Sequence, residues 1–304
     1  MTVPTVLLAT CADLPAGDED ADLLLAALDR AGVSGAWVVW DDPAVDWSAA
    51  PVVVRSTWDY ALSRDRFLAW IAAVPRLANP AATITWSLDK RYLADLASAG
   101  VPIVPTLWSE PGEAVTLPNA GEVVVKPSVG AGSRGAGRFA IGDSGGRTAA
   151  LDHAAGLHSA GRAVMVQPYL DEVDSAGEAA LIYVGGEFSH AITKSALLPA
   201  GTVHELGPEL ADAFAERELF VQEEIAPREP GVQERRVADA AMALVVARFG
   251  VPLYARVDLL PTPEGPVVLE LELAEPSLFL GHEAGAADRF AQAISAFVLD
   301  STTR

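Results

Sequence analysis

The stretch Tyr254–Leu273 reads YARVDLLPTPEGPVVLELEL, and the rest of the chain is interpreted outward from it. Two runs rich in valine and leucine flank a turn containing proline and glycine, which predicts two antiparallel strands. Side chains alternate between the two faces of a strand, so Arg256 and Asp258 share one face. Glu270 and Glu272 share a face of the second strand for the same reason. The hairpin therefore carries acids and an arginine on one side and apolar residues on the other.

The register of this hairpin decides what its polar face does. A turn centred on Glu264 places Asp258 opposite Glu270 and Arg256 opposite Glu272. Like charges that face each other destabilise a sheet, and clustered carboxylates are the hard oxygen ligands that suit Mg²⁺. The alternative is a solvated face with a cross-strand salt bridge. The apolar residues expected in the core are Val257, Leu259, Leu269, Leu271 and Leu273.

Composition narrows the class of protein. The 304 residues are 51% hydrophobic, and 21 basic against 41 acidic residues give a formal net charge of -20. Such an acid excess argues against a nucleic-acid partner, because phosphate backbones need a basic face. No apolar run is long enough to predict a membrane span, and the N-terminus is typical of a strand. A single cysteine, Cys11, forms no internal disulfide and is interpreted as a buried spectator, which favours the cytoplasm.

The chain contains only three lysines, Lys90, Lys126 and Lys194, and its other basic residues are arginines. Lysine is a compact, flexible point charge, whereas arginine is a planar fork. Where arginine replaces lysine almost everywhere, a lysine that remains marks a position whose chemistry requires it, with chance as the alternative. Lys126 ends the apolar run VVVK and leads into a loop rich in glycine, Val129–Gly137. Glycine allows the backbone to approach an anion, although a flexible hairpin tip fits as well.

Strand and helix signals alternate at the start of the chain and predict a parallel sheet covered on both faces. The expected strands are 6–9, 37–40 and 52–55, and the expected helices are 20–31 and 66–74. A helix is expected at Ser87–Ser98, followed by a small α+β lid. Later segments predict a hairpin at Gly185–Gly186, a helix at Glu234–Phe249 and a last helix at 284–299. Residues 199–232 are acidic and ambiguous, and we interpret them as a loop over the site. The expected domains are 1–82, 83–165 and 166–304.

Together these segments resemble the ATP-grasp superfamily over roughly residues 80 to 280. The matching features, in order, are Lys90, the VVKP run with its glycine loop, the QPYL segment at 167–170, and the two strands of the acidic hairpin. The resemblance implies an N-terminal parallel-sheet domain followed by two α+β lobes that enclose ATP. It also implies an ATP-dependent ligase that converts a carboxylate into an acyl phosphate for attack by an amine.

The resemblance assigns roles to individual residues. The ATP-binding set is Lys90, Lys126, Ser128, Gly130, Gly132, Gln167, Tyr169, Leu170 and Glu178, with Glu172 and Asp174 as alternatives to Glu178 for the ribose. The metal ligands are Asp258, Glu270 and Glu272, and two Mg²⁺ ions are expected, with Mn²⁺ as an alternative. Arg256 and Lys194 are the catalytic cations. Glu272 departs from the usual asparagine and makes the site more negative, and Ala180 replaces an arginine of glutathione synthetases.

Three further strings are similar to the group of cyclo-ligases that close O-ureido-D-serine to the antibiotic D-cycloserine. They are VRSTWDY at 54–60, GGEFSH at 185–190 and EPSLFL at 275–280. This resemblance implies a small amino-acid-like substrate, and it leaves a homodimer open. The alternatives are an intermolecular carboxylate-amine ligase, a nucleotide-binding sensor without catalysis, and an α/β protein that handles sugars or nucleotides without phosphoryl transfer.

The residues expected to contact the substrate follow a buried strand, where α/β sheets present their binding loops. They are Arg55, Ser56, Asp59 and Tyr60, with Arg55 on a carboxylate and Asp59 on an amino group. The alternative is that Arg55 pairs with Asp59 while Trp58 and Tyr60 only pack. His190 and His282 are interpreted as ordinary polar residues.

Overall fold

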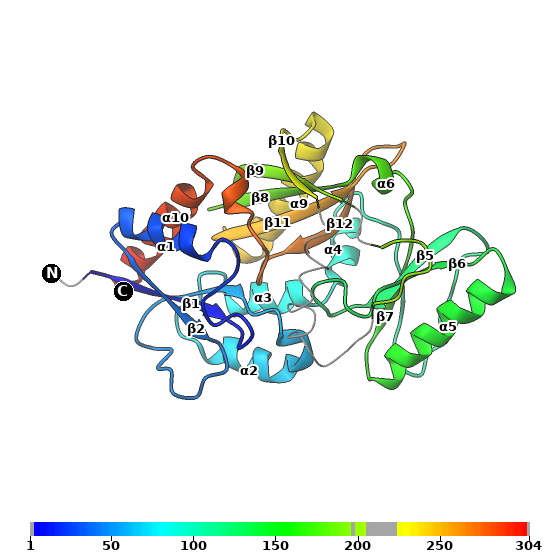
Figure 1. Ribbon diagram of the computed structural model, residues 1–304, viewed down its shortest axis with the longest axis horizontal. Helices are drawn as coiled ribbons and strands as arrows, with labels where there is room; N and C mark the ends of the chain where they lie inside the picture. The colour runs from blue at the N-terminus through cyan, green and yellow to red at the C-terminus, as the bar shows by residue number, and fades with distance from the viewer. Residues whose placement is uncertain (1–2, 196–197, 205–223, 303–304) are drawn as a thin grey trace.

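The computed structural model describes residues 3–195, 198–204 and 224–302 (Figure 1). The first part contains β1 (Thr5–Thr10), α1 (Ala21–Arg30), β2 (Ser34–Val39), β3 (Val52–Ser56), η1 (Tyr60–Leu62), α2 (Arg64–Ala73), α3 (Ala81–Leu88) and α4 (Tyr92–Ser98). The middle part contains β4 (Leu107–Ser109), β5 (Glu122–Pro127), β6 (Gly137–Ala140), α5 (Ser144–Ser159), β7 (Val164–Pro168) and α6 (Val173–Ala176). The last part contains β8 (Glu178–Val184), β9 (Glu187–Lys194), β10 (Ile225–Arg228), α9 (Val232–Phe249), β11 (Tyr254–Leu260), β12 (Val267–Glu272), η2 (Leu280–His282) and α10 (Ala286–Thr302).

The N-terminal sheet has the order β2-β1-β3 and is parallel, as predicted. Its side chains alternate between two cores because neighbouring residues of a strand point to opposite faces. Leu8 and Val53 pack in one core with residues of α1 and α10. Ala9 and Val54 pack in the other with residues of α2 and α3. Both faces of the sheet are therefore covered, which leaves the ends of its strands as the place for ligand-binding loops.

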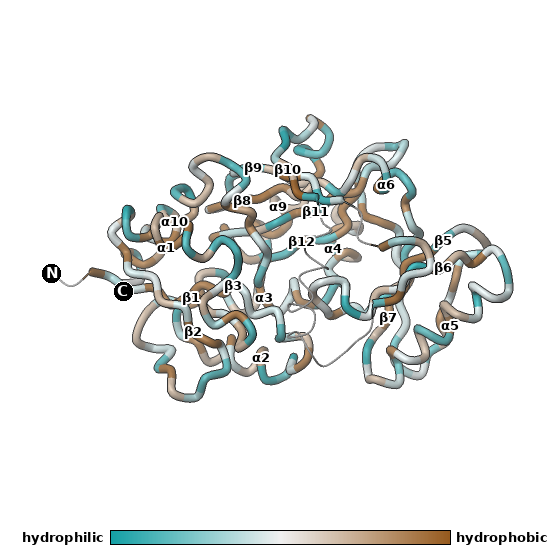
Figure 2. Tube along the Cα trace, viewed as in Figure 1, coloured by the Kyte–Doolittle hydropathy of each residue, from teal (hydrophilic) through white to brown (hydrophobic). Residues whose placement is uncertain are grey.

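The sheet with the order β4-β7-β5-β6 is antiparallel and is covered on one face by α5. Val123, Val125 and Val166 pack against α5, which accounts for the apolar run before Lys126. Figure 2 shows brown, hydrophobic stretches within this sheet, near the labels of β5 and β7. The opposite face carries Lys126, because it lies one residue beyond Val125 on the same strand. Strand alternation thus presents this lysine on the face that α5 leaves free.

The third sheet has the order β10-β9-β8-β11-β12, and α9 packs on one of its faces. Val257 and Leu271 lie on that covered face and are fully buried. Its outer strand β12 is also covered, because Val268 N donates to Pro102 O at 2.8 Å and the Tyr92 hydroxyl accepts from Leu271 N at 2.9 Å. These contacts protect an edge that would otherwise present unpaired backbone groups. The strand that carries Glu270 and Glu272 is therefore held on both sides.

A buried asparagine fastens the N-terminal part to this sheet. The Asn79 amide nitrogen donates to Tyr254 O at 2.9 Å and to Leu273 O at 2.7 Å, and its side-chain oxygen accepts from Leu253 N at 2.8 Å. Asn79 is 1% exposed. The predicted domain boundary near this residue is thus bridged by three hydrogen bonds, and the division into 1–82, 83–165 and 166–304 stays a prediction.

The single helix predicted at Ser87–Ser98 is wrong, because the chain breaks it between α3 and α4. Asp89 adopts an extended conformation, and Lys90 N donates to Ser128 O at 2.9 Å instead of continuing a helical ladder. Helical spacing on both sides of the break concealed it in the sequence. The interruption places Lys90 in a short link between two helices, with its backbone attached to the glycine-rich loop.

The acidic hairpin contains a β-bulge that the sequence pattern did not show. Arg256 to Asp258 follow the predicted register, but Leu259 pairs with Val268, so one extra residue lies on β12. Val268 consequently takes the place in the core that was predicted for Leu269. Leu269 is half-buried and packs in a smaller cluster near Leu260. The other predicted core residues of the hairpin, Val257, Leu259, Leu271 and Leu273, are buried.

The segment interpreted as a loop over the site has several parts. Val203 forms an isolated β-bridge with Gly137, and β10 pairs with β9. Two pieces of the segment 199–232 therefore form β-type pairings with other parts of the chain. Residues 205–223 lie outside the described part of the chain, so the predicted loop is not placed. Among the described residues, no helix combines the length and hydrophobicity needed to cross a membrane.

Candidate active site

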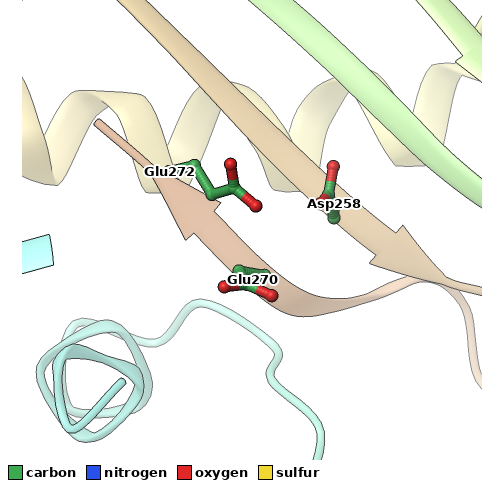
Figure 3. Close-up of side chains that lie close together, drawn as sticks. All are labelled: Asp258, Glu270 and Glu272. Atoms are coloured by element: carbon green, nitrogen blue, oxygen red, sulfur yellow. The ribbon is translucent and has the colours of Figure 1, made fainter. Parts of the chain in front are cut away.

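The predicted pairing of the acidic hairpin is confirmed, with Asp258 opposite Glu270 and Arg256 opposite Glu272. Each of the three acids offers a carboxylate oxygen within 4.8 Å of the others, and Figure 3 shows the three side chains gathered between β11 and β12. Asp258 is 1% exposed, so it does not lie on a solvated face, whereas the cross-strand salt bridge of the alternative is present between Arg256 and Glu272. Three clustered oxygen donors fit the coordination that Mg²⁺ prefers, with substrate phosphates completing it.

Two cations hold the aspartate of this cluster. The Arg256 guanidinium donates to Asp258 with Nε and Nη2, each at 2.8 Å, and also binds Glu272. Lys194 Nζ lies 3.3 Å from Asp258 and forms a second ion pair with Glu178. Glu178 is opposite Lys194 in the β8–β9 register, which explains how the two meet. Arg256 and Lys194 therefore lie beside the predicted metal ligands.

Of the other two lysines, Lys90 lies in the link between α3 and α4, and Lys126 lies on β5. Lys90 Nζ forms an ion pair with Glu270 at 2.8 Å and donates to Gly130 O at 2.8 Å. Lys126 lies near enough to Glu270 and Lys90 for their charges to affect its pKa. Within the described residues the Lys126 side chain has no hydrogen-bond or ion-pair partner. All three lysines of the chain therefore lie near the clustered acids, and Lys126 is the one whose side chain has no direct partner among the described residues.

Burial and mutual repulsion set the charge states of this cluster. Burial raises the pKa of Glu272 to about 8, and Glu270 and Asp258 contribute while Arg256 opposes the rise. Burial acts in the same direction on Asp258, but Arg256 and Lys194 outweigh it and hold its pKa below the usual range. Burial, with repulsion from Lys90, lowers the pKa of Lys126 to about 8, although Glu270 favours its charged form. A cationic ligand would relieve the repulsion among the acids.

Apart from Lys90 and Glu178, the residues expected to contact the nucleotide lie along β5, β7 and the loops that follow them. Ser128 is buried, and its carbonyl binds Lys90 N. Gly132 has a φ of 63°, a left-handed conformation that favours glycine. Gln167 lies opposite Val124 in the β5–β7 register, so it shares a face with Lys126. Its amide donates to Thr106 Oγ1 at 3.0 Å.

The expected adenine hinge continues past β7. Tyr169 stacks under the guanidinium of Arg138, and its hydroxyl binds Asp174. Leu170 packs in the small cluster that contains Val173 and Leu260. Asp174, one alternative for the ribose, is thus bonded to the hinge tyrosine, whereas Glu178 reaches the lysine of the acid cluster. These contacts place Glu178 beside Lys194, and its role toward ribose stays a prediction.

The predicted substrate residues have protein partners, and the alternative pairing of Arg55 with Asp59 is wrong. Arg55 is fully buried, donates to Pro276 O at 3.1 Å and pairs with Asp18 at 3.2 Å. Asp59 instead accepts from Trp40 Nε1 at 2.7 Å, and burial raises its pKa.

Ser56 and Tyr60, the remaining predicted substrate residues, are also buried. Ser56 shares a hydrogen bond of 2.8 Å with Thr10 and is fully enclosed. Tyr60 is 3% exposed, and its hydroxyl faces Glu275. Direct contact of these four residues with substrate stays a prediction.

Sequence reasoning missed two residues near the site. Glu275 is buried three residues beyond Glu272 and lies beside Lys90 and Glu270. The sequence did show a third glutamate soon after Glu270 and Glu272. Because β12 ends at Glu272, the alternation of side chains along the strand could not predict where Glu275 points. Asp18 pairs with Arg55 from a loop that carries no pattern. Cys11 is buried, as expected, and burial raises its pKa to about 11.

Comparisons with known proteins show what this chain is similar to. Residues 6–79 match the family model of the N-terminal domain of D-cycloserine synthetase DcsG. The cycloserine biosynthesis protein DcsG of Streptomyces lavendulae is 38% identical over 298 residues, which covers 91% of this chain and 93% of that protein. The crystal structure of D-cycloserine synthetase DcsG has a TM-score of 0.84 and 39% identity, covering 97% of this chain and 99% of that one.

More distant structures share the fold. A D-alanine–D-alanine ligase of Bacillus anthracis, solved with ATP, has a TM-score of 0.63 at 13% identity over 99% of this chain and 98% of that one. The ATP-grasp ligase PsnB, solved with Mg and ADP, has a TM-score of 0.57 at 16% identity over 97% of this chain and 98% of that one. The predicted ATP-grasp fold is therefore confirmed, and the chain belongs to the D-cycloserine synthetase DcsG family of ATP-dependent ATP-grasp ligases.

Proposed function

We propose that the chain uses ATP to activate the carboxylate of O-ureido-D-serine and then closes it to the antibiotic D-cycloserine in the cytoplasm. The proposal is carried by one observation: three acids, Asp258 buried and Glu270 and Glu272 half-buried, have carboxylate oxygens within 4.8 Å of one another and pair with Arg256, Lys90 and Lys194. The third lysine, Lys126, lies near enough to Glu270 for the charge to affect its pKa. Family membership supports the choice of substrate, because the relative at 38% identity is a cycloserine biosynthesis protein.

ATP is proposed to bind between the face of β5 that carries Lys126 and the hairpin of β11 and β12. Lys90 and Lys126 bind its phosphates, helped by backbone groups of Ser128, Gly130 and Gly132. The adenine lies at Gln167, Tyr169 and Leu170, and Glu178 is the ribose candidate. Lys90 must exchange part of its present contact with Glu270 for a phosphate oxygen. This exchange needs little movement, because lysine is a flexible point charge.

The metal ligands are proposed to be Asp258, Glu270 and Glu272, whose oxygens fit Mg²⁺. Two ions are proposed, with Mn²⁺ as an alternative. Bound Mg²⁺ neutralises the charge of the phosphates during transfer. Among the three acids, Glu272 is the one whose pKa a bound cation is proposed to lower most, because burial and its ionised neighbours raise that pKa in the free protein.

The reaction has two proposed steps. First, the substrate carboxylate oxygen attacks the γ-phosphorus of ATP, and ADP leaves with the electrons of the broken bond. Arg256 and Lys194 stabilise the resulting acyl phosphate from their positions beside Asp258. Then the oxyamine nitrogen of the same molecule attacks the acyl carbon, loses its proton, and displaces phosphate. The ring closes, and water releases the ureido group as carbon dioxide and ammonia. Binding both ends of one molecule lowers the barrier of the second step.

The direct test uses the purified chain with ATP, Mg²⁺ and O-ureido-D-serine. We expect ADP release that depends on both the substrate and Mg²⁺, and a product with the mass of D-cycloserine. No second amine is needed for a cyclisation. ADP release that occurs only after an amine is added, with a linear amide as product, contradicts the proposal in favour of an intermolecular ligase. ATP binding without any ADP release contradicts it in favour of a sensor.

Lys126 predicts a pH dependence of ATP binding. Its pKa is about 8 in the free protein, and bound phosphates raise it because they favour the protonated form. ATP affinity should therefore fall as the pH rises above about 8, by up to about tenfold per pH unit. Titration calorimetry with Mg·ATP between about pH 7 and about pH 9.5 measures the slope. In Lys126→Arg the cation does not titrate, so this part of the slope disappears. Equal slopes in the two proteins would show that Lys126 does not contact ATP.

A further inference from the structure

Glu275 occupies a fixed position between the acid cluster and the N-terminal part of the chain. Its side chain is buried, forms a hydrogen bond with the Tyr60 hydroxyl, and lies near enough to Lys90 and Glu270 for their charges to affect its pKa. Its backbone carbonyl accepts from Trp58 Nε1 at 2.9 Å. The carbonyls on either side, at 274 and 276, accept from a tyrosine at 2.7 Å and an arginine at 3.1 Å. The segment is therefore held rigidly, and the carboxylate is presented in one direction.

Every other acid of the site described above has a direct ion pair. Lys90 pairs with Glu270 at 2.8 Å, Arg256 pairs with both Asp258 and Glu272, and Lys194 pairs with Glu178. Among the described residues Glu275 has no such ion pair. Burial, with repulsion from Glu270, raises its pKa to about 7, although Lys90 and the Tyr60 hydroxyl favour its charged form. A buried carboxylate without a directly bound cation is costly, so the protein maintains an acid here at the expense of stability.

Glu275 is outside the group of acids that fits a metal. The three carboxylates within 4.8 Å of one another are Asp258, Glu270 and Glu272. Glu275 instead faces Tyr60, which comes from the N-terminal part where substrate residues were predicted. A cation carried by the substrate would pair with Glu275, next to the place where the substrate carboxylate is proposed to be phosphorylated. In an amino acid the ammonium group is attached to the carbon adjacent to the carboxyl group, so the two groups bind at neighbouring positions.

We propose that Glu275 binds the α-ammonium group of the amino-acid substrate, and that the Tyr60 hydroxyl orients its carboxylate. The inference rests on the proposed function, and it deepens that function by assigning the residue that recognises an amino acid. It gives Glu275 the role that the sequence suggested for Asp59, whose carboxylate is already bonded to Trp40. Tyr60 acts as a positioning residue, since it reaches the substrate through Glu275.

The test compares O-ureido-D-serine with its analogue that lacks the amino group, 3-(ureidooxy)propanoate, in steady-state ADP release. We expect the wild-type protein to prefer the amino substrate by about 10- to 100-fold in kcat/KM, the range for a hydrogen bond between charged groups. Glu275→Gln should abolish this preference by raising the KM for the amino substrate alone. The KM for ATP and the dependence on Mg²⁺ should not change. Tyr60→Phe should reduce the preference in the same direction by a smaller factor.

Glu187→Gln is the matched control, because Glu187 is exposed at the start of β9 and the substitution is the same. Its preference should equal that of the wild type. A Glu275→Gln protein that retains the preference, or one in which the KM for ATP rises while that for the substrate does not, overturns the inference. If Glu275→Gln fails to fold, Tyr60→Phe is compared with the wild type instead. A reduced preference for the amino substrate supports the inference, and an unchanged preference overturns it. Absence of wild-type turnover overturns the proposed function together with the inference, whereas wild-type turnover with an unchanged preference overturns the inference alone.

Discussion

Asp258→Asn should lower kcat for ADP release by about 1000-fold, the magnitude expected when a group that stabilises transition-state charge is lost. Asp258 is the most buried of the three clustered acids and has two direct cations, Arg256 and Lys194. The substitution keeps the shape but removes the charge that is proposed to bind Mg²⁺ and to hold both cations in place. Coupled measurement of ADP with saturating ATP gives kcat, and a magnesium titration gives the change in metal dependence.

The matched control for Asp258→Asn is Glu264→Gln. Glu264 is an exposed acid at the turn of the same hairpin, so this variant also removes one negative charge. Its kcat should stay within about twofold of wild type, because an exposed charge is screened by solvent. Normal turnover in Asp258→Asn, with an unchanged magnesium titration, would remove Asp258 from the metal site. Equal losses in both variants would point to a general effect of charge and contradict the assigned role.

Asn79→Ala should reduce the free energy of unfolding by about 3–5 kcal/mol, because three buried backbone groups lose their partner. Those groups are Leu253 N, Tyr254 O and Leu273 O, and they lie at the ends of the two strands of the acidic hairpin. A loss of this size is a large part of the roughly 5–15 kcal/mol that stabilises a typical domain. Urea unfolding followed by tryptophan fluorescence measures it as a lower midpoint.

The chain offers its own control for Asn79→Ala, since its one other asparagine, Asn119, is exposed. Asn119→Ala should change stability by less than about 0.5 kcal/mol. Asn79→Asp adds a further comparison, because its carboxylate can still accept from Leu253 N but has no amide hydrogens for the two carbonyls. A change below about 1 kcal/mol in Asn79→Ala would show that water replaces the lost contacts and that the connection contributes little.

The sequence predicted the strands of the acidic hairpin, its register from Arg256 to Asp258, and the face on which its charges lie. These features follow from the period of two along a strand, which each residue carries locally. The bulge at Leu269 escaped this reasoning, because an inserted residue changes the alternation without changing the composition. The sequence also did not predict the break in the helix before Lys90, because helical spacing continues on both sides of it. The break is stabilised by a hydrogen bond from Lys90 N to Ser128 O, which lies far away in the sequence.

The three lysines illustrate what composition can indicate and what only the tertiary structure shows. Their rarity marked Lys90, Lys126 and Lys194 from composition alone, and ATP-grasp resemblance gave them roles. Their meeting at one cluster of acids, and the absence of a partner for Lys126 within the described residues, depend on how separate sheets are oriented.

What the sequence determined by itself is therefore the set of elements and the chemistry of their faces, because periodicity and turn residues act over a few neighbours. The tertiary structure alone decided the partner of each charge. Arg55 pairs with Asp18 and not with Asp59, and Glu275 is buried beside Tyr60 with no ion pair to any residue that the structure describes. An ion pair depends on distance and on exclusion of water, and in this protein both arise from segments far apart in the chain.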